Sequence, residues 1–495
     1  MLTRLRSFLT SSTRPAGTAP ARPVRRPLGL ETLEDRSVPA AGLGSAFAVG
    51  STGSDIGRAT ATDPTGNVYV TGTFQGTVDL DPGPGVVALT AQASWPDLYV
   101  AKYGSDGVLA WARSLHANEN VAGQRPVVAC DLAVDGGGNV YLAGGFTKAV
   151  DFGGGYVLQD HAGGAGDAFL AKLGPDGSTA WAVDIGTGSQ NGDWANSVAV
   201  DGGGNVLVAG ALGTSSGVDA FVARYDASGL QSWAKQFHNG YQSVANGVAV
   251  DAAGNAYLTG SFRGTMDFDP GAGAYALASG GSRANPASAA YIVKLDAAGR
   301  FGWAVNFQAG NSGSSSGSDI GVDGSGNVVV AGSFSGAVDF DPGKGTRTLA
   351  WVANSDVFVV KLSPAGSLAW AKAVGGGDND SVTGLALDAQ GGVYLTGTFG
   401  MTVDFDPGSG TYNLTSAGSM DAFVMKLDAA GAFSWAASIG GPNEEFAGTI
   451  AVDGFGNVYT TGAFQLTADF DPAAGQYPLT SAGGWDAYVW KLRQV

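Results

Sequence analysis

Pairs of aspartates separated by one residue are the most regular potential ligands in this sequence. They belong to the loop motif Asp-Phe-Asp-Pro-Gly, whose three full copies contain Asp267/Asp269, Asp339/Asp341 and Asp404/Asp406. Carboxylates at i and i+2 could begin a calcium site, but Ca²⁺ takes roughly six to eight oxygens and the further acids of a calcium loop are absent. Asp-Pro-Gly alone favours a tight turn. We interpret the motif as a structural turn, with calcium as the open alternative and no other cofactor.

A second group of acidic and aromatic residues lies in loops that do not repeat between units. Acids could form hydrogen bonds with a sugar or a basic peptide, and exposed rings could stack on it. Solvated loop tips are the structural alternative. The candidate ligand-binding residues are Asp193, Trp194, Tyr241, Asp378, Asp380, Glu444 and Glu445.

The motifs of common enzyme classes are missing. The chain has no nucleophile elbow, HExxH zinc motif, phosphate-binding loop or dinucleotide fingerprint. His116, His161 and His238 occupy unrelated repeat positions, which predicts neither a metal cluster nor a histidine base. We therefore predict that the protein is not an enzyme. A carbohydrate-active enzyme with two rim carboxyls about 5–10 Å apart is the alternative.

The segments that carry these residues repeat seven times. The pattern Asp-x-x-Gly-Asn-Val-Tyr-Val-x-Gly-x-Phe recurs in six steps between Asp63 and Asp453, an average period of 65 residues. A second pattern, Asp-Ala-Phe-Val-x-Lys-Leu, follows each copy, and in six units a tryptophan lies 14 positions after its first residue. The first pattern starts at Asp63, Asp135, Asp201, Asp251, Asp323, Asp388 and Asp453.

Each unit contains four short segments rich in Val, Leu, Tyr, Phe and Trp, named strands A to D in chain order. No helical periodicity could supply crossovers, so the strands are expected to be antiparallel. Repeated four-stranded antiparallel units are typical of a β-propeller. The last unit ends after strand C, and Ala46–Val49 supplies a surplus strand D at the other end of the chain. The sequence predicts an all-β, seven-bladed propeller completed by its N-terminal strand.

Loop lengths vary on only one face of the predicted disc. The A–B and C–D turns are constant, whereas the B–C and D–A links, which share the other face, are not. Asp219 follows Leu212 by 7 positions, while the same link spans 21–27 positions in the other units. Loops on a rigid scaffold commonly bind ligands. We predict that a ligand docks on the B–C/D–A face, in a notch of unit three beside Asp193 and Trp194.

A basic residue recurs at one place in strand C of all seven units. Because a function needs one site rather than seven, we interpret these residues as structural and paired with a repeated aspartate. The repeated tryptophan is interpreted as core. The basic residues are Lys102, Lys172, Arg224, Lys294, Lys361, Lys426 and Lys491.

The net charge of −17 is unevenly distributed. Residues 1–40 carry seven arginines and three acids, which leaves 19 basic and 40 acidic side chains in residues 41–495. Residues 41–495 are therefore strongly acidic and should repel the phosphate backbone of a nucleic acid. We expect a cationic or polyhydroxyl partner and no binding of nucleic acid. No apolar run approaches the roughly 18 residues of a membrane span. Because Cys130 is the single cysteine, the chain cannot form an intrachain disulfide. We also expect the protein to be a monomer.

The repeated string DAQGGVYLTGTFGMTVDFDPGSG…DAFVMKLDAAGAFSWA resembles the bacterial seven-bladed β-propeller repeat (SBBP) family over residues 45–495. The segment Leu30–Ala40 resembles a leader found on large extracellular bacterial proteins. The resemblance implies a disordered leader, residues 1–40, and a propeller, residues 41–495, that is secreted or at the cell surface although no classical signal peptide is visible. We expect a noncatalytic binding protein whose partner is a polysaccharide or protein; a purely structural or adhesive spacer is a further alternative.

Overall fold

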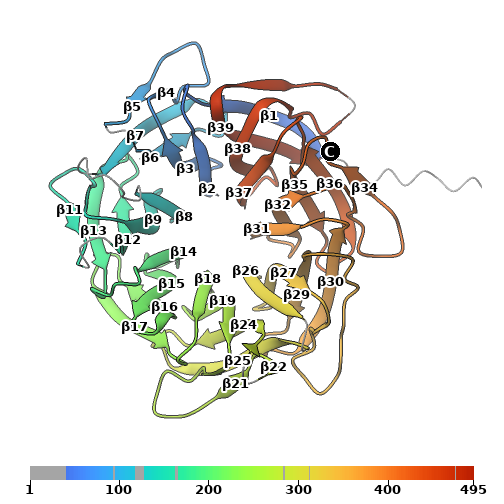
Figure 1. Cartoon of the computed structure of the whole chain (residues 1–495). Coiled ribbons are helices and arrows are strands. Elements are labelled where there is room, and N and C mark those ends of the chain that lie inside the picture. The colour runs from blue at the N-terminus through green and yellow to red at the C-terminus, as the bar shows by residue number, and fades with distance from the viewer. Residues whose placement is uncertain are drawn as a thin grey trace, which may run out of the picture. The chain divides into compact units, whose positions relative to one another are not determined.

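The computed structural model describes residues 41–92, 95–117, 127–161, 165–282, 285–310, 313–473 and 475–494. All of them belong to one compact unit, Pro39–Val495, and the predicted leader, residues 1–40, lies outside them. Within this unit, seven main antiparallel sheets are arranged in a ring (Figure 1), and residues of their innermost strands line a cavity at its centre, the central channel. The predicted all-β, seven-bladed propeller is confirmed. No helix in the described ranges is long and apolar enough to cross a membrane.

Each blade has four main strands, A to D, which run outward from the channel in chain order, except that strand D of blade 7 is the N-terminal β1. Blades 1 to 3 comprise β2 (Ile56–Thr62), β3 (Val68–Phe74), β6 (Asp97–Tyr103) and β7 (Leu109–Ala117); β8 (Val128–Val134), β9 (Val140–Phe146), β12 (Asp167–Leu173) and β13 (Thr179–Ile185); and β14 (Trp194–Val200), β15 (Val206–Thr214), β16 (Gly217–Tyr225) and β17 (Gln231–Phe237).

Blades 4 to 7 repeat this arrangement. They comprise β18 (Ser243–Val250), β19 (Ala256–Arg263), β24 (Ser288–Leu295) and β25 (Phe301–Ala309); β26 (Ser314–Val322), β27 (Val328–Ser335), β29 (Asp356–Leu362) and β30 (Leu368–Gly376); β31 (Ser381–Leu387), β32 (Val393–Phe399), β35 (Asp421–Leu427) and β36 (Phe433–Ile439); and β37 (Glu445–Val452), β38 (Val458–Asp469), β39 (Pro478–Gln494) and β1 (Ala41–Val49).

Strands B and C are apolar along almost their whole length because both of their faces are buried. Every residue of β3, for example, is buried. Each sheet packs face to face between two neighbours, so side chains on both faces leave water. One core cluster joins Leu207 and Val222 of blade 3 to Leu258 and Phe262 of blade 4. The hydrophobic core is therefore a series of layers between blades.

The ring is closed by the N-terminal strand. β1 pairs with β39 in an antiparallel register that runs from Ala41 opposite Gln494 to Val49 opposite Ala487. This confirms the predicted closing strand, which begins at Ala41 rather than at Ala46. Ala46 joins the core cluster that contains Trp435 of blade 6. The two ends of the propeller thus share one sheet.

Most B–C insertions form small hairpins that reach back to the preceding blade. We call them clasp hairpins. The first aspartate of the Asp-Phe-Asp motif, or its variant, bridges to strand D of that blade at four junctions: Asp151 to His116, Asp339 to Gln308, Asp404 to Gly375 and Asp469 to Gly440. The insertion strands are β4 (Thr77–Asp79), β5 (Ala88–Thr90), β10 (Ala149–Asp151), β11 (Val157–Gln159), β20 (Thr265–Asp267), β21 (Ala276–Ala278), β22 (Gly281–Ser282), β23 (Asn285–Pro286), β28 (Val338–Asp339), β33 (Thr402–Asp404) and β34 (Asn413–Thr415).

The motif residues hold the clasp hairpin in place. Phe405 is fully buried and its ring contacts those of Phe399 and Phe423. Asp404 Oδ1 accepts hydrogen bonds from the backbone N–H groups of Asp406 (3.0 Å) and Tyr412 (2.8 Å). The same contacts recur at Asp267 and Asp339. The first aspartate of the motif therefore fixes both ends of the turn.

Three of the repeated basic side chains pair with a repeated aspartate, as predicted: Arg224, Lys361 and Lys426. The other four lie over a tyrosine ring of their own blade, with Nζ 5.0–5.1 Å from the ring centroid: Lys102, Lys172, Lys294 and Lys491. Lys361 and Arg224 lie 2.9 and 2.7 Å from the A–B turn aspartates of their own blades. The repeated tryptophan lies in the hydrophobic core or packs against it, as predicted, and it also joins neighbouring blades. Trp111 Nε1 donates to the carbonyl of Pro175 in the next blade, and a Cβ at Gly177 would lie only 2.9 Å from its ring. Equivalent Nε1 bonds are made by Trp181, Trp233, Trp303 and Trp370.

Ring closure through β1 can be tested with a charge in this strand. Val49 is 1% exposed, so Val49→Asp buries an unpaired carboxylate and should lower the free energy of unfolding by about 3–5 kcal/mol. The matched control is Ser45→Asp, because Ser45 is an exposed residue of the same strand. Urea denaturation measures both variants. Equal stability of Val49→Asp and the parent would contradict closure by β1.

Candidate functional site

The aspartates suggested as calcium ligands lie in the turns of the clasp hairpins. In each pair the second aspartate accepts a hydrogen bond through Oδ1 from the N–H of the glycine two residues later, at 2.8 Å. These bonds join Asp269 to Gly271, Asp341 to Gly343 and Asp406 to Gly408.

The structure does not bring these aspartates together into a larger ligand set. A Cβ on Gly273 or Gly345 would lie 2.1 Å from the Oδ2 atom of Asp269 or Asp341, so the turn closes tightly around both carboxylates. Within the described residues, none of the three pairs belongs to a group of three or more metal-ligating side chains. The contacts of Asp267, Asp269, Asp339, Asp341, Asp404 and Asp406 thus account for the motif as a turn, and calcium binding by them stays a prediction.

Four acids of the D–A loops occupy one repeated position. Asp55, Asp193, Asp380 and Glu445 each lie at the start of strand A and are at most 1% exposed. Asp380 accepts hydrogen bonds from the N–H groups of Gly376 (2.7 Å) and Gly400 (3.3 Å), which ties the D–A loop to the end of strand B. The expectation that these loop acids do not repeat is therefore wrong. Because these four carboxylates are buried, they are not the exposed hydrogen-bond acceptors for a ligand that the sequence suggested.

Each of these acids has a second carboxylate near it, from the aspartate that begins the repeated strand-C motif in the preceding blade. The charge of Asp421 acts on Glu445, and that of Asp356 acts on Asp380. Burial, reinforced by these like charges, raises the pKa of Glu445 to about 8 and that of Asp380 to about 7. The remaining pairs are Asp55 with Asp486 and Asp193 with Asp167.

The other predicted ligand-binding residues lie nearer the surface. Asp378 and Glu444 are partly exposed, and Glu444 Oε1 accepts a hydrogen bond from Ser419 Oγ at 3.1 Å. Tyr241 is 45% exposed and lines a cavity of about 440 Å³. Trp194 is half-buried, and a Cβ on Gly145 would lie 2.3 Å from its ring. These residues are not brought into one site, and ligand binding by them stays a prediction.

Each of the three histidines contacts the strand-C aspartate of its own blade, and the prediction that their repeat positions are unrelated is wrong for His116 and His238. His116 and His238 lie 19 positions after Asp97 and Asp219, the aspartates that begin the repeated strand-C motif in blades 1 and 3. Their Nδ1 atoms lie 2.8 and 2.7 Å from the Oδ2 atoms of these aspartates. The common spacing could have revealed this pair. His161 contacts the same position in blade 2 from a different loop, so no sequence spacing identifies it.

The junction of blades 2 and 3 concentrates ionisable side chains. His161 Nδ1 lies 2.9 Å from Asp167 Oδ2 and 2.8 Å from Asp184 Oδ2. Burial, together with the charge of Asp167, raises the pKa of Asp184 to about 6. The hydrogen bond to Asp167 raises the pKa of His161. Sequence reasoning missed this cluster because Asp184 belongs to strand D rather than to a loop.

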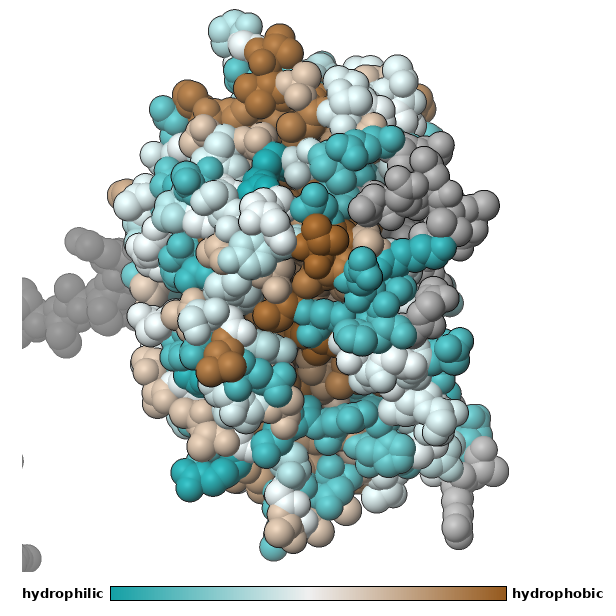
Figure 2. Space-filling model, turned by 90° about the vertical axis from the view of Figure 1, so that its left-hand side faces the viewer, coloured by the Kyte–Doolittle hydropathy of each residue, from teal (hydrophilic) through white to brown (hydrophobic). Residues whose placement is uncertain are grey.

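Blade 3 has the predicted notch, because β15 and β16 are joined directly and carry no clasp hairpin. A cavity of about 320 Å³ lies there. Figure 2 shows the side of the disc on which β11 and β13 lie, with a strip of hydrophobic surface between hydrophilic residues. Asp193 and Trp194, which the sequence placed beside the notch, are not among the lining residues. Those that line the cavity include Asp184, Thr187, Leu212, Tyr225, Gln231 and Ala234.

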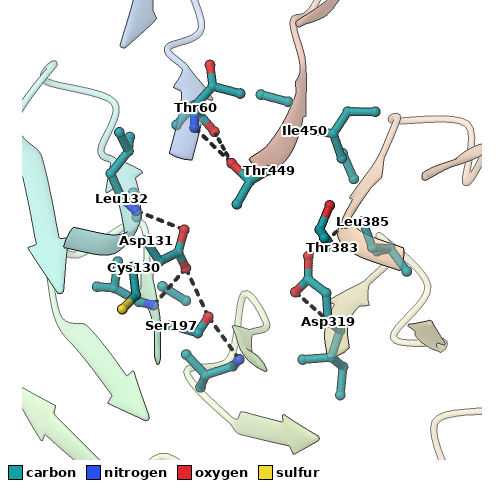
Figure 3. A pocket seen from close by; sticks show the side chains of 18 of the residues that line it. Thr60, Cys130, Asp131, Leu132, Ser197, Asp319, Thr383, Leu385, Thr449 and Ile450 are labelled. Atoms are coloured by element: carbon teal, nitrogen blue, oxygen red, sulfur yellow. Dashed lines mark hydrogen bonds between the residues drawn. The ribbon is translucent and has the colours of Figure 1, made fainter. Parts of the chain in front are cut away.

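The central channel holds a second candidate cavity, of about 430 Å³ (Figure 3). Asp131 and Asp319 line it from opposite sides. Burial raises the pKa of Asp131 to about 6, and burial together with the charge of Asp131 raises that of Asp319 to about 7. Neither acid was predicted as a site residue, although each lies four positions before its A–B turn aspartate, where the other units have small uncharged residues.

Both channel carboxylates connect the innermost strands of adjacent blades. Asp131 Oδ2 accepts hydrogen bonds from Ser197 Oγ and from the N–H of Val198, both at 3.0 Å. Asp319 Oδ2 accepts the N–H of Leu385 at 2.7 Å. An innermost strand has one edge without a strand partner, so these bonds satisfy amides that would otherwise face the channel. The contacts assign the two acids a structural role.

No family model matches the chain, so the resemblance to the SBBP family stays a prediction. A segment of 135 residues is 32% identical to the regulatory protein FlaEY of Caulobacter vibrioides, covering 27% of this chain and 14% of that protein. The uncharacterized WD repeat-containing protein L264 of Acanthamoeba polyphaga mimivirus is 23% identical over 394 residues, covering 64% of this chain and 28% of the relative. The chain thus spans less than a third of either relative.

Solved structures resemble the chain only distantly. Chaetomium thermophilum Sqt1 bound to the N-terminus of ribosomal protein L10 has a TM-score of 0.38 at 10% identity, covering 92% of this chain and 99% of Sqt1. An ulvan lyase of polysaccharide lyase family PL25 has a TM-score of 0.40 at 11% identity, covering 84% of this chain and 93% of the lyase. Likenesses this weak carry no argument about function.

The buried carboxyl pairs predict a pH dependence of stability. The pKa of Glu445 is about 8 in the folded protein against an ordinary 4.5, so the folded state holds a proton that the unfolded state has lost between these values. Stability should therefore fall as the pH rises from about 5 to 8. Glu445→Gln should reduce this fall by about 1–3 kcal/mol. Urea denaturation at several pH values tests this, with the partly exposed Glu444→Gln as control; identical profiles for Glu445→Gln and the parent would refute it.

Proposed function

We propose that the protein is a noncatalytic binding protein, secreted or at the cell surface, that docks a polysaccharide on its B–C/D–A face in the notch of blade 3. The observation that carries the proposal is the missing clasp hairpin, which opens a cavity of about 320 Å³ beside β13, β16 and β17. Sugar-binding pockets combine apolar surface with a few hydrogen-bonding groups. The cavity offers both, through Leu212 and Tyr225 and through Thr187 and Gln231.

The charge of the body supports the choice of ligand. Residues 41–495 hold 19 basic and 40 acidic side chains, which disfavours an anionic partner over long range. A neutral or cationic polysaccharide meets no such repulsion. A basic protein segment would satisfy the same charge, and a ligand screen with both classes separates the two. We further propose that the protein is secreted or at the cell surface, is a monomer and is related to the SBBP family.

One observation favours a carbohydrate-active enzyme as the second candidate. Asp131 and Asp319 line the central cavity with raised pKa values of about 6 and 7, which is the range expected of a general acid. Against this reading, their oxygens already accept backbone and hydroxyl hydrogen bonds. Hydrolysis or elimination of a bound glycan that Asp131→Asn or Asp319→Asn abolishes would establish the enzyme instead.

The docking proposal is tested by filling the notch. Ala234 is exposed and lines the cavity, so Ala234→Trp should occupy it and weaken glycan binding by about 10-fold or more, the loss expected when a pocket is blocked. Ser232→Trp adds the same ring two residues away, outside the lining, and is the matched control. Glycan-array binding of residues 41–495 followed by calorimetry provides the measurement. Unchanged binding by Ala234→Trp would place the site elsewhere.

A further inference from the structure

Three potential metal ligands meet at the junction of blades 2 and 3. Nδ1 of His161 lies 2.9 Å from Asp167 Oδ2 and 2.8 Å from Asp184 Oδ2. One ligand atom from each of the three residues lies within 4.8 Å of the other two. No other group of three such residues with this proximity occurs in the described part of the chain. The arrangement brings together a loop residue, the start of strand C and the end of strand D.

The repeats of the protein provide an internal comparison for this cluster. His116 with Asp97 and His238 with Asp219 form the same histidine–aspartate contact in blades 1 and 3. Asp184 lies 17 positions after the first residue of strand C, and only blade 2 has an acid there. The residues at that place in blades 1 and 3 to 6 are Ser114, Gln236, Asn306, Ala373 and Ser438. Blade 2 alone therefore adds a second carboxylate to the pair.

The added carboxylate leaves the junction short of positive charge. Asp167 and Asp184 lie close enough to contact each other, and even a cationic His161 balances only one of the two charges. Asp167 is fully buried, and its Oδ1 atom has no hydrogen-bond partner, as in the equivalent Asp219, Asp356 and Asp486. What blade 2 adds is a second such atom, Oδ1 of Asp184. A buried, unpartnered carboxylate oxygen is costly unless a proton or a cation satisfies it. A bound cation would balance the excess negative charge and would give the unpartnered carboxylate oxygens a ligand.

The junction is also open to solvent. His161 is 61% exposed, and Asp184 lines the cavity of the notch. A Cβ on Gly186 would lie 2.3 Å from Asp167 Oδ2 and 2.8 Å from His161 Nδ1, so only glycine leaves these atoms accessible. The equivalent residues in blades 1 and 3 are His116 and His238 themselves. In blade 2 the histidine, His161, comes instead from the B–C insertion that contains the clasp hairpin. Gly186, which has no side chain, leaves the space beside His161 and Asp167 open.

We propose that His161, Asp167 and Asp184 bind one divalent transition-metal ion of the zinc class. One imidazole nitrogen and two carboxylate oxygens are ligands that Zn²⁺ accepts, and three protein ligands leave a coordination position for water or a ligand group. A set without imidazole would instead favour Ca²⁺ or Mg²⁺. The competing arrangement is a protonated His161 that donates to both aspartates without metal. The proposal does not depend on the polysaccharide, because metal binding is measured in its absence.

Titration of the full chain with Zn²⁺ by calorimetry, and with Co²⁺ by its visible absorption, tests the site. One equivalent of each ion should bind, with a rise in melting temperature. Asp184→Ser introduces the residue that blade 1 has at this place, so the fold should persist. The affinity should fall by more than the roughly 10- to 100-fold that loss of an outer-shell partner costs. His161→Gln should have a similar effect.

His238→Gln is the matched control, because it removes an equally exposed histidine–aspartate contact that has no second acid. It should leave Zn²⁺ and Co²⁺ binding unchanged. No saturable binding to the parent chain would overturn the proposal in favour of the protonated arrangement. Equal affinity in Asp184→Ser and the parent, or equal loss in His238→Gln, would also overturn it. Circular dichroism of each variant confirms that a loss of binding is not a loss of fold.

Discussion

Every blade of this propeller depends on its two neighbours, because the central strands of each sheet are apolar on both faces. A single four-stranded sheet of this composition would expose residues such as Tyr257 and Ile292 to water; in the ring both are at most 1% exposed. The other contacts between blades add to this packing of sheet on sheet. They are made by the clasp hairpins, by the tryptophan that packs on a glycine of the next blade's turn, and by the loop carboxylates. Sequence variation is therefore tolerated where such contacts are not weakened.

Blade 3 shows how one of these contacts can be dispensed with. It has no clasp hairpin, but β15 and β16 continue their pairing to Thr214 and Gly217. The basic residue of its strand C is an arginine rather than a lysine. The guanidinium of Arg224 donates hydrogen bonds to Asp201 and to the carbonyl of Gly254 in the next blade. A guanidinium can make these two bonds at once because its donors point in a fixed fork. Lys361 of blade 5 makes the corresponding contacts with Asp323 and with the carbonyl of Ala429 in the next blade, the latter at 3.4 Å. The bond of Arg224 to Gly254, at 2.8 Å, is therefore a shorter form of a repeated contact.

The fold could be predicted from the sequence because its information is local and repeated. The constant spacing of the strand-C aspartate and the strand-D tryptophan defines seven units, and the missing last strand identifies β1. The site could not be predicted in the same way, since burial depends on residues of another blade. Asp193 and Asp380 look like loop acids in sequence, yet the neighbouring strand covers them. His161 reaches Asp167 across a loop, and Asp184 reaches it across a β-ladder, so no spacing joins the three.

The difference between a structural acid and a functional one lies in what the fold gains from it. Asp131 accepts two hydrogen bonds from blade 3, so its burial is offset by contacts that the ring uses. Asp167 likewise accepts the N–H of His161 and occupies a position that six blades fill with aspartate. Asp184 has no equivalent in other blades, and its burial beside Asp167 raises its pKa to about 6. The repeat does not require Asp184, and its Oδ1 atom has no hydrogen-bond partner, so this acid is better explained by what the junction binds than by how the blades pack.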